Sequence, residues 1–132
     1  MRAMIMAMIL SLTAGTLSAK PHLRDVPQID GTILAVGIAH EIRDNCPYIS
    51  ARLIKAFRLV SGLKATAMNL GYTSEEIDEY RKSDTEKARL KAKRDAYLAQ
   101  GGVSPGQSDG YCELGRKEIE KGSQIGTLLR MN

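Results

Sequence analysis

The stretch SARLIKAFRLVSGLKATAMNL, residues 50–70, carries the clearest periodicity in the chain. Its apolar residues recur at spacings of three and four, which places them on one face of an α-helix: Leu53, Ala56, Phe57, Val60, Leu63, Ala67 and Leu70. Ser50 is positioned to cap the start of this helix and Gly71 its end. The apolar face would suit a membrane surface, but Phe57 is its one aromatic residue. We therefore expect this face to pack inward against a core.

The preceding segment, residues 28–45, is apolar around most of its circumference. What remains is one narrow polar stripe of Asp30, Gly37, Glu41 and Asp44. Pro27 and Pro47 bound the segment, because proline does not suit a helix interior and the residue before it avoids the helical region. A helix of this composition belongs in the middle of a small bundle.

The C-terminal half predicts further helices separated by clear breaks. Thr73 or Ser74 caps a helix with acids in its first turns, and Ser83 with Asp84 can kink or restart it before residues 85–100. Glycines and a proline in residues 101–108 predict a loop. No segment alternates apolar and polar residues as a half-buried strand does. The sequence predicts an all-α fold, a bundle of about four to five helices.

A last helix is expected over residues 109–121. Gly122 and Ser123 predict its end and a new cap before a terminal turn. Glycine is costly within helices, so Gly115, Gly122 and Gly126 suggest that helices approach one another closely in this region.

The first nineteen residues, MRAMIMAMILSLTAGTLSA, have the layout of a cleavable secretory signal. Arg2 provides the positive start, residues 4–12 an apolar run too short to cross a membrane, and residues 17–19 a small-residue cleavage site. We expect residues 1–19 to be removed, leaving one helical domain over 20–132, periplasmic or secreted and without stable membrane insertion.

Charge is mildly basic overall and unevenly distributed. The 132-residue chain has a formal charge of +4. Residues 52–64 hold four bases and no acid, and residues 87–94 hold five bases without an aromatic residue beside them. A solvated helix face is the ordinary interpretation of each. Nucleic acid is not an expected partner, because stacking residues are missing and exported proteins rarely meet it.

Cys46 and Cys112 are the two cysteines of the chain. In an oxidising compartment two isolated cysteines usually pair, and their spacing fits neither a redox C-x-x-C motif nor a haem attachment site. We expect one disulfide that staples the bundle. It would stabilise the fold by roughly 4 kcal/mol on the chain-entropy model.

Catalytic signatures are missing from the sequence. It contains no nucleophile elbow, phosphate loop, dinucleotide fingerprint or recognised metal-ligand spacing. The best polar cluster is formed by His40, Glu41 and Asp44. We expect it to be a network at the end of the helix, in which Arg43 or a base of the second helix, residues 50–70, neutralises the acids. No catalytic residue, metal or cofactor is assigned.

Four segments together resemble one family: AKPHLRDVPQID (19–30), EIRDNCPYISAR (41–52), LGYTSEEIDEY (70–80) and YCELGRKEIEKGSQIGTLLR (111–130). They are similar to domain-of-unknown-function family 5333, small exported proteins of alphaproteobacteria. The resemblance covers nearly all of residues 20–132. It implies a periplasmic setting and a cysteine pair, and it brings no assigned activity or site.

Three functions are compatible with these observations. The first is non-catalytic binding of another envelope component, either a protein or an anionic component. The second is carriage of a small lipid-like ligand, which a cavity lined by Leu53, Phe57, Val60 and Leu63 would favour. The third is a metal-dependent or hydrolytic enzyme, which convergence of His22 with His40 would favour.

Overall fold

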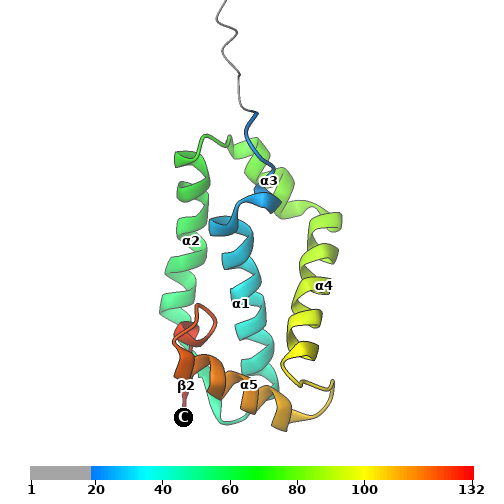
Figure 1. The fold of residues 1–132 in the computed structure, drawn as a ribbon. Coiled ribbons are helices and arrows are strands. Elements are labelled where there is room, and N and C mark those ends of the chain that lie inside the picture. Colours follow the sequence, from blue (N-terminus) through cyan, green and yellow to red (C-terminus); the bar gives the residue numbers. More distant parts are fainter. Residues whose placement is uncertain (1–18) are drawn as a thin grey trace, which may run out of the picture.

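The computed structural model describes residues 19–132, so the predicted signal peptide up to residue 18 lies outside the described residues. The helices of this region are α1 (Pro27–Asn45), α2 (Leu53–Asn69), α3 (Ser74–Lys82), α4 (Asp84–Gln100) and α5 (Ser108–Lys121). Two short 3-10 turns, η1 (Leu23–Asp25) and η2 (Gly126–Leu128), and two three-residue strands, β1 (Ile49–Ala51) and β2 (Leu129–Met131), complete it. The predicted all-α bundle is confirmed (Figure 1).

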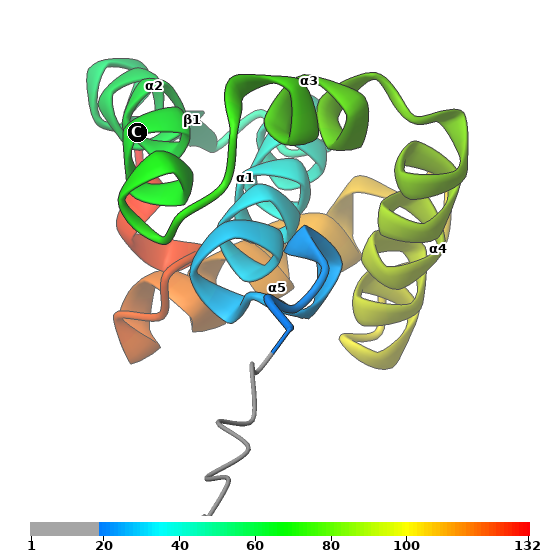
Figure 2. The same cartoon turned by 90° about the horizontal axis from the view of Figure 1, so that it is seen from above.

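Helix α1 occupies the centre of the molecule, as its nearly continuous apolar surface predicts. α2 and α4 lie on either side of it, α3 crosses above, and α5 packs beneath (Figures 1 and 2). The main core joins α1 to α5 and the C-terminal turn, and its most deeply buried aliphatic side chains are Ile38, Ile42, Leu128 and Leu129. A smaller core around Leu23, Ile29 and Ala67 lies at the α3 end.

Most of the polar stripe of α1 faces α4, while Asp44 at its end is exposed. Asp30 is buried and accepts hydrogen bonds from Arg89 and Lys93, while Glu41 forms an ion pair with Arg94 at 3.2 Å. Arg89, Lys93 and Arg94 belong to the basic run at 87–94. These bases hold α4 against α1, with Arg89 and Arg94 half-buried, whereas Lys87 and Lys91 of the same run lie on the solvated face.

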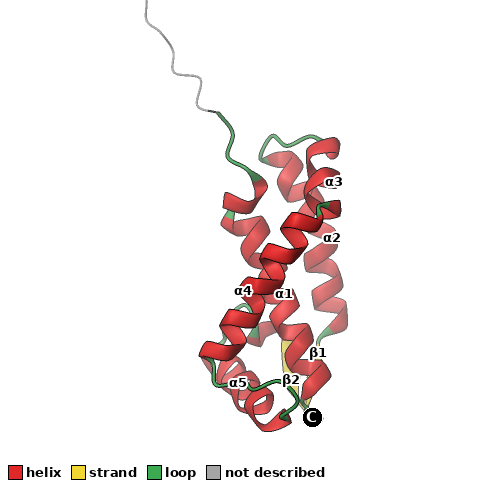
Figure 3. Cartoon of the chain, turned by 90° about the vertical axis from the view of Figure 1, so that its right-hand side faces the viewer, coloured by secondary structure: helices red, strands yellow, loops and turns green. Residues whose placement is uncertain are grey.

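The two strands pair antiparallel, with Ser50 opposite Arg130 (Figure 3). The prediction that Ser50 caps the second helix is therefore wrong: α2 begins at Leu53, and Arg52 is the residue before it. The prediction for Gly71 is confirmed. Gly71 has a φ of +94°, and the Tyr72 N–H donates to the Ala67 carbonyl at 3.1 Å, which closes α2 with a Schellman-type end.

Caps separate α3 from α4 as the sequence indicates. The Thr73 side chain accepts from the Glu76 N–H, and the Glu76 carboxylate accepts from the Thr73 N–H at 2.7 Å. The Ser83 side chain accepts from the Glu86 N–H at 3.2 Å and starts α4. The chain therefore turns between these two helices instead of continuing as one kinked helix.

The expectation that α2 packs its apolar face inward is wrong for most of that face. Leu53, Phe57 and Val60 are 65%, 73% and 48% exposed. The side of α2 that meets the core is displaced around the helix and consists of Ala56, Leu59, Leu63 and Ala67. The cause is the position of α4: it packs on the far side of α1 and leaves the α2 face uncovered (Figure 2).

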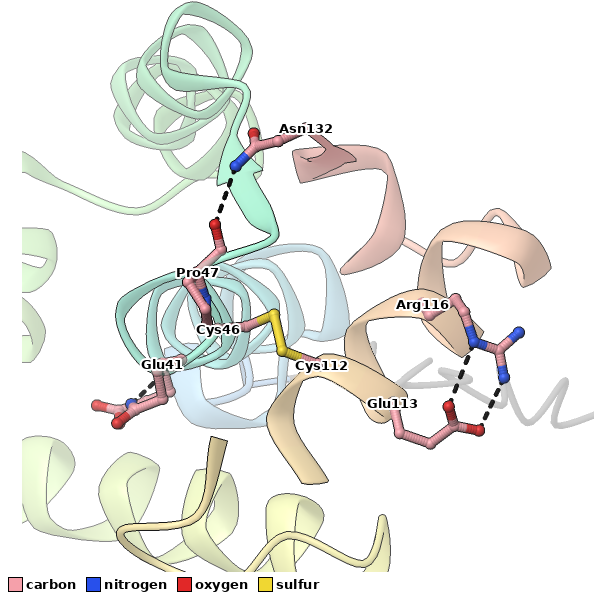
Figure 4. The surroundings of a disulfide bond; sticks show 8 residues. Glu41, Cys46, Pro47, Cys112, Glu113, Arg116 and Asn132 are labelled. Carbon is pink, nitrogen blue, oxygen red and sulfur yellow. Dashed lines mark hydrogen bonds and ion pairs between the residues drawn. A yellow bond between two sulfur atoms is a disulfide. The ribbon is translucent and has the colours of Figure 1, made fainter. Parts of the chain in front are cut away.

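Cys46 and Cys112 form the predicted disulfide, with their Cα atoms 5.1 Å apart. The bond joins the end of α1 to the first turns of α5, and the Asn132 side chain donates to the Pro47 carbonyl beside it (Figure 4). Residues that are 66 positions apart in sequence are thereby held together at one end of the molecule.

Gly115 lies where α5 crosses α1, and a Cβ there would overlap the side chains of Ile42 and Ile49. Gly126 similarly approaches the Glu118 carbonyl, whereas Gly122 has open space and a φ of +64°.

We expect Gly115→Ala to lower the free energy of unfolding by about 1–3 kcal/mol through overpacking. In urea denaturation, the control Gly62→Ala should raise it by up to about 1 kcal/mol, since Gly62 has no neighbour within 4 Å. Equal effects of the two variants would contradict this assignment.

Candidate functional site

A groove of about 590 Å³ lies between α2 and α4. Ile29 and Ile33 of α1 line its floor, and residues of α3, which lies above α1 in Figure 1, line one end. Most of its lining is aliphatic or aromatic and includes Ile33, Phe57, Val60, Leu63, Ile77 and Leu90. Charged side chains stand at its edge: Lys64, Asp78, Arg81 and Lys87.

The groove exists because α2 and α4 each pack on α1 and are connected through α3. Phe57 and Val60 line it, and Phe57 stays largely exposed and Val60 about half exposed. Apolar side chains of this size normally become buried on folding, which is worth about 1.5–3 kcal/mol each. Their exposure along a concave surface marks the groove as a place where an apolar guest would be stabilised.

A second, smaller hollow of about 110 Å³ lies farther along α1 and is lined in part by Val36, His40 and Leu53. Ile29, Ile33, Val36 and His40 follow one another at helical spacings of four and three, so they share one face of α1. The two hollows therefore lie in line along the same helix. Of the four residues that the sequence places on a carrier cavity, Phe57, Val60 and Leu63 line the main groove, and Leu53 lines the smaller hollow.

The structure brings His40 and Asp44 together and turns Glu41 away from them. His40 Nε2 lies 3.1 Å from Asp44 Oδ2, and Arg43 pairs with Asp44 at 2.6 Å. Arg43 therefore neutralises the acid as expected. The partner of Glu41 is Arg94 of α4, not a base of the second helix, and this part of the expectation is wrong.

His22 and His40 line different hollows. His22 belongs to a polar cleft of about 430 Å³ beside α3, where Lys20 pairs with Glu76 at 2.8 Å. His40 belongs to the small hollow near the other end of α1. Within residues 19–132, no group of three or more His, Cys, Asp or Glu side chains is arranged to hold a metal ion.

We expect His40→Gln to change the free energy of unfolding by about 1 kcal/mol or less. His40 is exposed, and its contacts to Arg43 and Asp44 are surface ion pairs and hydrogen bonds. Thermal denaturation of the variant and the parent protein would measure the change. Stoichiometric zinc or copper in the native protein, lost in a folded His40→Gln variant, would contradict a structural role.

Sequence reasoning missed one buried polar network. Asp30 accepts from Tyr80 at 2.6 Å and from two nitrogens of Arg89, and Arg89 also donates to Glu86 at 2.7 Å. Burial opposes ionisation of Asp30, but the hydrogen bonds from Arg89 and Tyr80 outweigh it and hold its pKa below the ordinary value. Asp30 and Arg89 are 59 positions apart, so no local sequence pattern predicts their pairing.

The buried acid Glu118 of α5 is held in the same manner. It accepts from Tyr97 at 2.6 Å and from Ser123 and Lys121. Burial works against its ionisation, but these donors together lower its pKa. Tyr97 is affected in turn, because its burial and its hydrogen bond to Glu118 raise its pKa to about 12. Both acids are saturated with internal donors, which is the pattern of structural groups.

These features define a small helical protein, closed by one disulfide, with an open apolar groove over its central helix. The chain belongs to the family of unknown function DUF5333, whose family model matches residues 21–130. This match confirms the family resemblance carried by the four sequence segments. Neither a curated protein nor a solved structure matched the chain.

Proposed function

We propose that this protein is a non-catalytic binding protein of the cell envelope, and that the groove holds the apolar part of another envelope component. The observation that carries the proposal is the exposure of Phe57 and Val60 on the wall of the groove. A volume of about 590 Å³ is within the range of about 300–1,000 Å³ that small-molecule sites occupy.

The polar groups around the groove support binding rather than catalysis. Ser61 donates to the Arg58 carbonyl at 3.2 Å, and the Tyr80 hydroxyl donates to Asp30, so both hydroxyls that line it are engaged. Asp78 pairs with Arg81 at 3.4 Å. A general base in catalysis must reach the reacting group, and these side chains are committed to neighbours within the fold.

Carriage of a lipid-like molecule is the second candidate, and a specific observation favours it. Phe57, Val60 and Leu63 form one continuous wall opposite Leu90. This wall would suit an aliphatic chain, and the charged edge residues would face its polar end.

An envelope location is supported by the disulfide, because such bonds persist in oxidising compartments. Among residues 19–132, no helix combines the length and apolar character needed to cross a membrane. If export removes residues 1–19 as proposed, intact-mass measurement of envelope-extracted protein should give a chain that begins at Lys20. Retention of Met1 in that material would contradict cleavage.

The proposal is tested with a photo-crosslinking residue at position 57 of the native protein, recovered from the envelope after irradiation. We expect mass spectrometry to find one dominant crosslinked protein or lipid. Val60→Glu should abolish that product, because it places a charge on the groove wall. Ala96→Glu is the matched control, since it places the same charge on an exposed position of α4 that does not line the groove.

A crosslinked protein supports the first candidate, and a crosslinked lipid that persists in Ile54→Ser supports the second. A product that survives Val60→Glu, or no product from position 57, would contradict binding in the groove.

A further inference from the structure

The exposed large apolar side chains of residues 19–132 are concentrated in one part of the molecule. They are Tyr48, Leu53, Ile54, Phe57, Val60, Met68, Leu70 and Met131. All of them belong to α2, to the strands beside it or to the residues that flank these elements. Ile54 is 71% exposed and Met68 49%, and neither lines the groove. Phe57 and Val60 also line the groove, so the exposed apolar surface of α2 begins at the groove wall and extends beyond it through Ile54 and Met68.

Ile54, Phe57, Ser61 and Met68 follow one another at helical spacings of three, four and seven, so they share the outward side of α2. We call this row, with the flanking bases Lys55, Arg58 and Lys64, the α2 surface. Because α2 is at the edge of the molecule (Figure 2), this row can meet a flat partner along the whole helix.

The charge of this surface has one sign. Helix α2 contains no acid, and its bases Lys55, Arg58 and Lys64 form no ion pair with any acid of residues 19–132. The basic run of α4 behaves differently, since each of its five bases pairs with an acid. The positive charge of α2 is thus available to an external anion.

We infer that the α2 surface docks on an anionic lipid bilayer. A helix that presents apolar side chains in a row with bases beside them lies in the interface between headgroups and acyl chains. Ile54, Phe57 and Met68 would enter the acyl boundary, while Arg58 and Lys64 extend their charged ends to the phosphates. The charge complementarity and the extended row, rather than a compact cluster, favour a bilayer over a globular acidic protein.

The inference is tested by sedimenting the purified protein with vesicles of phosphatidylglycerol and phosphatidylcholine in equal parts, and with vesicles of phosphatidylcholine alone. We expect binding to the mixed vesicles that weakens as salt rises above about 0.1 M. Arg58→Gln should lower the partition coefficient about fivefold, the equivalent of about 1 kcal/mol for one base. Ile54→Ser should lower it about tenfold or more, because an apolar anchor is lost.

The matched control is Lys117→Gln, which removes the same charge from an exposed position on α5. Circular dichroism should show that all three variants stay folded, since the substituted side chains are exposed. Equal binding to both kinds of vesicle, or equal loss in Arg58→Gln and Lys117→Gln, would overturn the inference. So would the absence of binding to the mixed vesicles. Ile54→Ser should leave the groove product of the crosslinking experiment unchanged, which separates this inference from the proposed function.

Discussion

The variant Cys112→Ser is expected to lose about 2–5 kcal/mol of unfolding free energy, the usual cost of removing a native disulfide from a small secreted domain. The bond ties α1 to α5 across 66 positions of sequence, and Cys46 is buried in the main core. A loss of this size is comparable with the whole stability of many domains. The melting temperature should fall by on the order of 10 °C or more.

Reduction provides the control for this prediction. Dithiothreitol should bring the parent protein to the melting temperature of Cys112→Ser and should not affect the variant itself. A parent protein that melts at the same temperature with and without the reductant would show that the bridge does not stabilise the fold.

The variant Asp30→Asn is expected to lose about 3 kcal/mol of unfolding free energy at neutral pH, the lower end of the cost of breaking a buried ion pair. Asp30 is 4% exposed and faces Arg89, Tyr80 and Lys93. The loss stays at the lower end because Arg89 keeps its contact with Glu86. Urea denaturation of Asp95→Asn gives the matched control: Asp95 is exposed on α4 and pairs with Lys91 and Arg94, and its loss should cost at most about 1 kcal/mol.

The difference between the parent protein and Asp30→Asn should depend on pH. Because the pKa of Asp30 is lowered in the folded state, its stabilising effect is complete above the pKa of an unfolded aspartate, about 3.9, and is lost as pH falls toward the folded value. The two proteins should therefore converge in stability in acid. A constant difference from neutral pH to below pH 3 would show that the negative charge of Asp30 does not stabilise the fold.

The helices of this protein can be predicted because their ends depend on local residues. Pro47 ends the first helix, Thr73 and Glu76 form a cap from neighbouring positions, and Gly71 and Gly122 supply the backbone conformation that terminates a helix. These effects act within one turn of the chain.

The strands and the covering of α2 could not be predicted in the same way. A strand of three residues is too short to show alternation, so the pairing that takes Ser50 away from the helix leaves no trace in the sequence pattern. Periodicity identifies which face of α2 is apolar, but it does not reveal whether another helix covers that face. The exposure of Phe57 depends on where α4 packs, and ion pairs such as that of Glu41 with Arg94 determine this position.

The polar cluster of His40, Glu41 and Asp44 contains one contact that could be predicted from the sequence and one that could not. His40 and Asp44 meet because residues four apart on a helix are neighbours. Glu41 is also a neighbour of Asp44 on the helix, but its carboxylate pairs with Arg94, 53 positions away, which no local rule specifies.

The packing of α5 beneath α1 also determines the order in which the chain can fold. Synthesis delivers α1 early, but Ile38 and Ile42 are covered largely by Leu114, Leu128 and neighbouring residues that arrive last. Because these contacts are distant in sequence, we expect collapse to wait for nearly the full length of the chain and to be slow for a helical protein. The thiol of Cys112 also arrives late, and Cys46 has no other cysteine with which to form an internal bond. Oxidation within one chain thus has a single possible product, the native pairing, and no shuffling step is required.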